Sequence, residues 1–138
     1  MCSRMLRHPV SFLFGVLPDE PFHGGTMSEA QEQRAVIEYC DWAKLPCLHI
    51  PNGGYRNKIE AANLKRQGVR AGVPDLFIPR PRGEYHGLFI EMKTKKGRAT
   101  EKQLEWIQLL RKEGYRAQVC HGADEAIALI REYMKGKA

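Results

Sequence analysis

The chain has 138 residues, of which 43% are hydrophobic and 28% are charged, with a formal net charge of +6. These values are ordinary for a globular domain with an adequate core, which excludes a largely disordered chain. No apolar run reaches the roughly 18 residues of a membrane span, so none is predicted. The basic excess favours an acidic partner, of which nucleic acid is the commonest.

The four cysteines form no C-x-x-C pair, so the sequence predicts neither a zinc knuckle nor a redox motif. A metal site of Cys40, Cys47 and His49 is a weak alternative, because their spacing matches no zinc pattern. Free thiols without a disulfide framework are typical of a cytoplasmic protein.

The amino-terminal segment contains VSFLFGVL, which has the character of a short signal sequence. The following LPDEPFHGG offers no small-residue cleavage site, so we do not predict a signal peptide. We expect residues 1–26 to be an unstructured extension, with Met27 as an alternative start. Residues 27–138 are expected to form one domain.

The first helix is expected over SEAQEQRAVIEYCDWAK, because Ser28 suits an N-cap and Gln31 occupies the capping-box position. A short strand is expected over 45–51, followed by the turn-forming Asn-Gly-Gly. The pattern over 56–69 predicts a second helix with Gly68 at its carboxyl end.

Two strands, 76–78 and 88–93, flank a turn rich in proline and glycine, and together they predict a β-hairpin. Thr100 is expected to cap a helix over 101–113. A strand over 116–121, parallel to its neighbour, and a helix over 123–135 complete the chain. The order α-β-α-β-β-α-β-α predicts an α/β fold with a mixed four-stranded sheet flanked by helices.

Three charged residues interrupt the apolar runs of this hairpin. A hairpin centred on Gly83 places Asp75 opposite Glu91, and side-chain alternation puts Lys93 on the same face as Glu91. Adjacent carboxylates repel unless a cation neutralises them, and Mg²⁺ prefers oxygen ligands of this kind. A neighbouring ammonium can orient a water or stabilise a phosphoryl oxygen, so the pattern predicts phosphodiester hydrolysis.

The alternative reading is that Asp75 caps a turn, while Glu91 and Lys93 form a solvent-facing pair. That reading would be preferred for an arbitrary D…E-x-K match. Here both carboxylates interrupt strands of one hairpin and a basic loop follows directly, which favours the catalytic reading.

The stretches GVRAGVPDLFIP and GLFIEMKTKKGRATEKQLEWIQLLRKEGY strongly resemble the VRR-NUC family of the PD-(D/E)xK nuclease superfamily. The resemblance spans roughly 28–122 and implies a restriction-endonuclease-like core with metal-dependent DNA endonuclease activity. It implies that Asp75, Glu91 and the main-chain carbonyl of Met92 hold the metal. Lys93 would be the catalytic lysine, with Gln103 close to the active site.

A glutamate of the first helix commonly completes such sites. Glu32 is the expected residue, because its face continues the apolar stripe of the helix, and Glu29 is the alternative. Glu32 could instead only stabilise the helix dipole.

Basic residues flank the proposed site on both sides and are expected to contact phosphates as a set. They are Arg56, Lys58, Lys65, Arg66, Arg70, Lys95, Lys96, Arg98 and Lys102. His49 and Asn52 could touch DNA or water, or be a half-buried histidine and a turn residue. Trp106 is expected in the core with Leu109 and Leu110.

The resemblance is to the small stand-alone members from phages and bacteria, which implies a cytoplasmic enzyme. It implies Mg²⁺ or Mn²⁺ and no small-molecule cofactor. Without a sequence-reading module, the expected substrate is branched DNA such as a four-way junction, cut by a two-fold homodimer. The alternatives are a flap, nick or duplex nuclease, a catalytically silent nucleic-acid-binding module, and a metabolic α/β enzyme.

Overall fold

The computed structural model describes residues 27–52 and 57–137. The expected extension over 1–26 and the expected phosphate contact Arg56 lie outside the described residues. None of the described helices is both long enough and apolar enough to cross a membrane.

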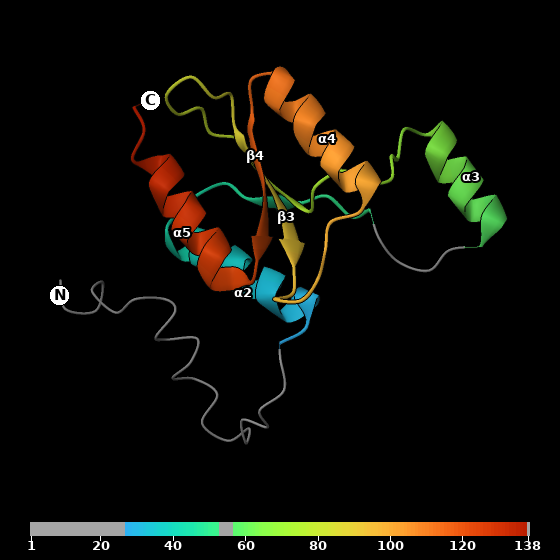
Figure 1. The fold of residues 1–138 in the computed structure, drawn as a ribbon, viewed down its shortest axis with the longest axis horizontal. Coiled ribbons are helices and arrows are strands. Elements are labelled where there is room, and N and C mark those ends of the chain that lie inside the picture. Colours follow the sequence, from blue (N-terminus) through green and yellow to red (C-terminus); the bar gives the residue numbers. More distant parts are fainter. Residues whose placement is uncertain (1–26, 53–56, 138) are drawn as a thin grey trace.

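The described residues form a mixed four-stranded sheet with four helices around it (Figure 1). This confirms the expected α/β architecture and the expected order of elements. The helices and strands in chain order are α2 (Glu29–Trp42), β1 (Leu48–His49), α3 (Lys58–Arg66), β2 (Leu76–Ile78), β3 (Leu88–Lys93), α4 (Glu101–Lys112), β4 (Arg116–His121) and α5 (Ala123–Met134).

The sheet order is β1-β2-β3-β4, with antiparallel pairing of the first three strands and parallel pairing of β3 with β4. Phe77 pairs with Phe89, and Leu76 with Ile90. This is the register expected for a hairpin centred on Gly83, whose φ of +56° suits a residue without a Cβ. β1 is shorter than the expected strand, with two residues in place of seven.

Two helices begin as their sequences predict. Ser28 caps α2 in a capping box with Gln31, and Thr100 caps α4 in a capping box with Gln103. Each box satisfies backbone N–H groups that the first turn of a helix leaves without partners. The second box fixes where α4 starts, and therefore fixes where Gln103 lies relative to β3.

The sheet separates two cores of unequal size. Ile90, with other fully buried residues of β2 and β3, packs with α2 and α5 in the larger core. On the opposite face, Phe89 packs with Ile107 and Leu110 of α4 in a smaller, aromatic core. Phe77 stacks on Phe89 there, with ring centroids 4.3 Å apart.

α3 differs from the other helices, because it buries none of its residues. In Figure 1 it lies beyond the end of α4, away from the sheet. Ile59 on this helix is 77% exposed. A nine-residue helix with so little packing depends on its caps, which Asn57 provides at the start and Arg70 at the end, by donating to the Lys65 carbonyl.

Candidate active site

Asp75 directly precedes β2 and is held by the two neighbouring strands. Its carboxylate Oδ2 accepts the backbone N–H of Met92 at 2.8 Å. Its main-chain oxygen accepts the N–H of Ile50 at 2.7 Å and lies 2.9 Å from Nδ1 of His49. His49 therefore contacts the backbone of Asp75, and the carboxylate is fixed against the end of β3.

Glu91 lies on the α4 face of β3 and is 1% exposed. Its Oε1 accepts a hydrogen bond from Nε2 of Gln103 at 2.9 Å and lies 3.4 Å from Nζ of Lys93. Its Oε2 is buried with no hydrogen-bond partner among the described residues. Oε1 of Glu91 therefore has two polar partners, whereas Oε2 has none in the described part of the chain and is free to accept a further ligand.

Burial, and after it the negative charge of Asp75, raise the pKa of Glu91 to about 8, while Lys93 opposes the shift. A buried carboxylate without a hydrogen-bond partner is costly, because the charged form loses its hydration. A cation at Oε2 would remove this cost and would favour the ionised form of Glu91.

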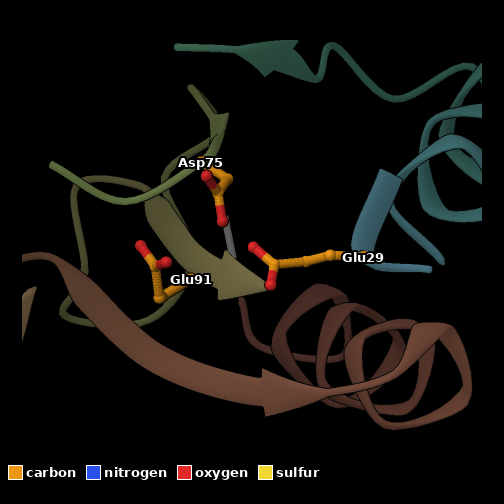
Figure 2. A group of neighbouring side chains, drawn as sticks. All are labelled: Glu29, Asp75 and Glu91. Atoms are coloured by element: carbon orange, nitrogen blue, oxygen red, sulfur yellow. The ribbon is translucent and has the colours of Figure 1, made fainter. Parts of the chain in front are cut away.

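Figure 2 shows the carboxylates of Glu29, Asp75 and Glu91 converging from α2, from the residue before β2 and from β3. One oxygen from each lies within 4.8 Å of the others. Among residues 27–52 and 57–137, this is the one group of three or more acidic, histidine or cysteine side chains with such spacing. The alternative set of Cys40, Cys47 and His49 is not brought together in this way.

The glutamate of α2 whose carboxylate lies beside Asp75 and Glu91 is Glu29, whereas the expected Glu32 lies elsewhere. Glu32 accepts the backbone N–H of Ala123 at 2.6 Å, at the start of α5. Because it lies on the α2 face that packs against α5, it neutralises a helix N-terminus instead of reaching the hairpin. The buried stripe of α2 therefore marked the face toward α5, whereas the site lies beside the first turn of α2.

The donor set fits a hard divalent cation. Three carboxylates supply oxygen ligands, and the buried Oε2 of Glu91 needs a positively charged partner. Gln103 and Lys93 hold the other oxygen of Glu91 in a fixed orientation. The participation of the Met92 carbonyl stays a prediction.

The expected phosphate contacts occupy two places. Lys95, Lys96 and Arg98 lie exposed on the loop between β3 and α4, directly after Lys93. The others among the described residues lie on or just beyond α3, or on the first turn of α4, and all are exposed: Lys58, Lys65, Arg66, Arg70 and Lys102. Both places border the segments that carry the acidic site.

His121 at the end of β4 was missed by the sequence reasoning. Its Nε2 lies 3.0 Å from the Gly97 carbonyl oxygen, so this side chain contacts the basic loop between β3 and α4. It pairs in register with Lys93, the last residue of β3. The expected parallel pairing of strands 88–93 and 116–121 could have revealed this position.

Comparisons with known proteins agree with this geometry. The VRR-NUC domain matches residues 27–124. A solved structure described as a VRR_NUC domain protein superposes with a TM-score of 0.70 and 38% identity, covering 82% of this chain and 93% of that one. No curated protein matches. The family match and the shared fold agree, and the chain belongs to the VRR-NUC domain family of nuclease-type proteins.

Proposed function

We propose that this protein is a metal-dependent DNA endonuclease that hydrolyses phosphodiester bonds in branched DNA. The observation that supports it most directly is the buried, unpartnered Oε2 of Glu91 beside two further carboxylates and the Lys93 ammonium. A core without catalytic use would not leave this atom unsatisfied, because the cost of such burial is high.

Glu29, Asp75 and Glu91 would hold the cation, with Mg²⁺ or Mn²⁺ as the proposed ion. When bound, such an ion polarises the scissile phosphoryl group and neutralises developing negative charge. Gln103 keeps Glu91 oriented through its 2.9 Å hydrogen bond. It acts as a positioning residue in this proposal.

Lys93 supplies a positive charge on the face that carries the carboxylates. Its side chain is only 12% exposed and its Nζ is 3.4 Å from Glu91. A partly desolvated ammonium can donate hydrogen bonds to a phosphoryl oxygen or orient an attacking water. The basic loop over 94–100 extends from this point and offers further phosphate contacts.

The preference for branched DNA rests on the family and on the missing sequence-reading module. Cutting two strands requires two active sites, which a two-fold homodimer provides with the symmetry of a four-way junction. The cytoplasm is the proposed compartment, in keeping with the free thiols of Cys40, Cys47 and Cys120. Light scattering that gives a monomer mass in a fully active sample would exclude the homodimer.

The deciding experiment is cleavage of a labelled four-way junction beside flap, nicked and linear duplexes. Wild type and Asp75→Asn are each assayed with Mg²⁺, Mn²⁺ or EDTA. We expect paired symmetrical cuts in the junction, lost with EDTA and with the variant. Metal-dependent cutting spread over all DNAs would keep the chemistry and discard the junction preference. Tight binding without any cutting would favour the silent binding module.

A further inference from the structure

A cleft of about 500 Å³ lies between α3 and α4, beside the acidic site but separate from its carboxylates. Leu64 and Val69 form part of an apolar wall, and the indole of Trp106 lines the α4 side. Lys65, Arg70 and Lys102 also line the cleft, with Glu105 as its one acidic residue. The cleft thus combines an aromatic surface with a net positive charge.

Trp106 is only partly the core residue that its sequence neighbours predicted, because it packs against the edge of the smaller core. It is half-buried, and Leu109 is 48% exposed, while only Leu110 is buried. The indole Nε1–H donates to the Ala71 carbonyl oxygen at 3.0 Å. This bond fixes the ring at the wall of the cleft without using its π face.

The cationic groups are positioned to meet an anion. Arg70 donates from Nη1 to the Lys65 carbonyl at 2.7 Å, which attaches its guanidinium to the end of α3. Because a guanidinium carries five N–H donors, Arg70 can keep this bond and still donate to a phosphate. Lys65 and Lys102 approach the same cleft from α3 and α4.

The cleft and the candidate active site share backbone segments. Lys102 directly precedes Gln103, which donates to Glu91. Gly72 has a φ of +90°, and a Cβ there would lie 2.8 Å from the Lys102 carbonyl carbon. The backbone at Gly72, three residues before Asp75, is therefore packed against the first turn of α4. A ligand in the cleft would be held at a fixed offset from the carboxylates.

We propose that this cleft binds one unpaired nucleotide of the DNA substrate, with its base stacked on Trp106 and its phosphate near Lys65, Arg70 and Lys102. This inference rests on the proposed nuclease function and narrows its substrate, within branched DNA, to sites where a nucleotide near the cleaved bond is unpaired or becomes unpaired on binding. The volume lies in the range of small-ligand pockets, and base stacking on an aromatic side chain needs no particular base. A paired base must first be unpaired and unstacked, and that cost favours a nucleotide that is already unpaired.

The test uses Trp106 as its own reporter. Trp42→Phe removes the other tryptophan of the chain, which is 50% exposed and belongs to neither the cleft nor the site. This full-length variant is titrated in EDTA with a hairpin closed by a non-nucleotide linker, so that every nucleotide is paired, or with the same hairpin carrying a short unpaired gap. Anisotropy of a dye on the DNA shows when each is bound. We expect the gapped hairpin to quench Trp106 emission strongly and the paired hairpin to leave it nearly unchanged.

Two further variants separate stacking from folding. Trp106→Leu and Trp106→Phe both lose the bond to Ala71, but only the phenylalanine keeps an aromatic face. We expect Trp106→Leu to weaken binding of the gapped hairpin by about 5- to 100-fold, with Trp106→Phe recovering most of that loss. Affinity for the paired hairpin should be unchanged in both.

Equal quenching by both hairpins, no quenching at saturation, or an equal loss of affinity for both DNAs in Trp106→Leu would overturn the proposal. The last result would make the cleft a general contact to the DNA backbone. Because no cleavage is measured in EDTA, the outcome is distinct from that of the proposed function. Selective quenching in a protein that cuts no DNA would keep the nucleotide site and reject the nuclease.

Discussion

The two faces of β3 show how one six-residue strand serves two purposes. Ile90 and Met92 point into the larger core against α2 and α5 and are fully buried. On the other face, the apolar Phe89 is followed by two charged residues, Glu91 and Lys93. The first face stabilises the sheet, whereas the second holds a buried charge that lowers stability unless a cation is bound. Changes on the two faces should therefore affect different measurements.

The largest effect is expected from removing a charge at the acidic site. Asp75→Asn removes a proposed metal ligand, and Lys93→Ala removes the neighbouring ammonium; either should lower the cleavage rate by about 10³-fold or more. DNA binding by Asp75→Asn should persist, because this variant removes a negative charge near the phosphates. Single-turnover cleavage and DNA binding are the measurements.

Glu113→Gln is the matched control, because Glu113 is an exposed carboxylate just after the far end of α4. It should cleave at the wild-type rate. Near-normal turnover by Asp75→Asn or Lys93→Ala would reject the assignment of the site.

The opposite face should respond in stability. Ile90→Ala leaves a cavity in the larger core, so the free energy of unfolding should fall by about 2–5 kcal/mol. Leu109→Ala, at a side chain that is 48% exposed, should change it by less than about 0.5 kcal/mol. Urea unfolding measures both. If Ile90→Ala lowered cleavage per folded molecule as much as Asp75→Asn does, the division between the faces would be wrong.

The two glutamates in the first turn of α2 offer a sharper version of the comparison. Glu29→Gln should lower cleavage at limiting Mg²⁺ by about tenfold or more with little change in stability. Glu32→Gln should lower the free energy of unfolding by about 0.5–2 kcal/mol, because a charge is lost from the start of α5, and should leave cleavage per folded molecule intact. The reverse assignment of effects would restore Glu32 as the site residue.

The last comparison uses pH in the metal-free protein. The pKa of Glu91 is about 8 in the folded chain and near 4.5 when unperturbed, so the folded state binds more protons between these values. The contribution of Glu91 to stability is therefore present below about pH 4.5 and is lost as pH rises toward 8. The increase in Tm on adding Mg²⁺ should be larger at pH 8 than at pH 6. Glu91→Gln should abolish both trends in a thermal unfolding series.

The sequence by itself determined the hairpin register, the capping boxes at Ser28 and Thr100, and the proximity of Glu91 to both Asp75 and Lys93. Strand alternation, capping and turn residues act over a few positions, so local patterns report them directly.

Only the tertiary structure decided which glutamate of α2 lies at the site, how little α3 is packed, and that Trp106 lines a cleft. Glu29 and Glu32 are separated by less than one helical turn, so the packing angle of α2 against α5 determines which carboxylate reaches the hairpin. That angle depends on contacts between residues distant in the sequence, such as Glu32 with Ala123, which no local pattern contains.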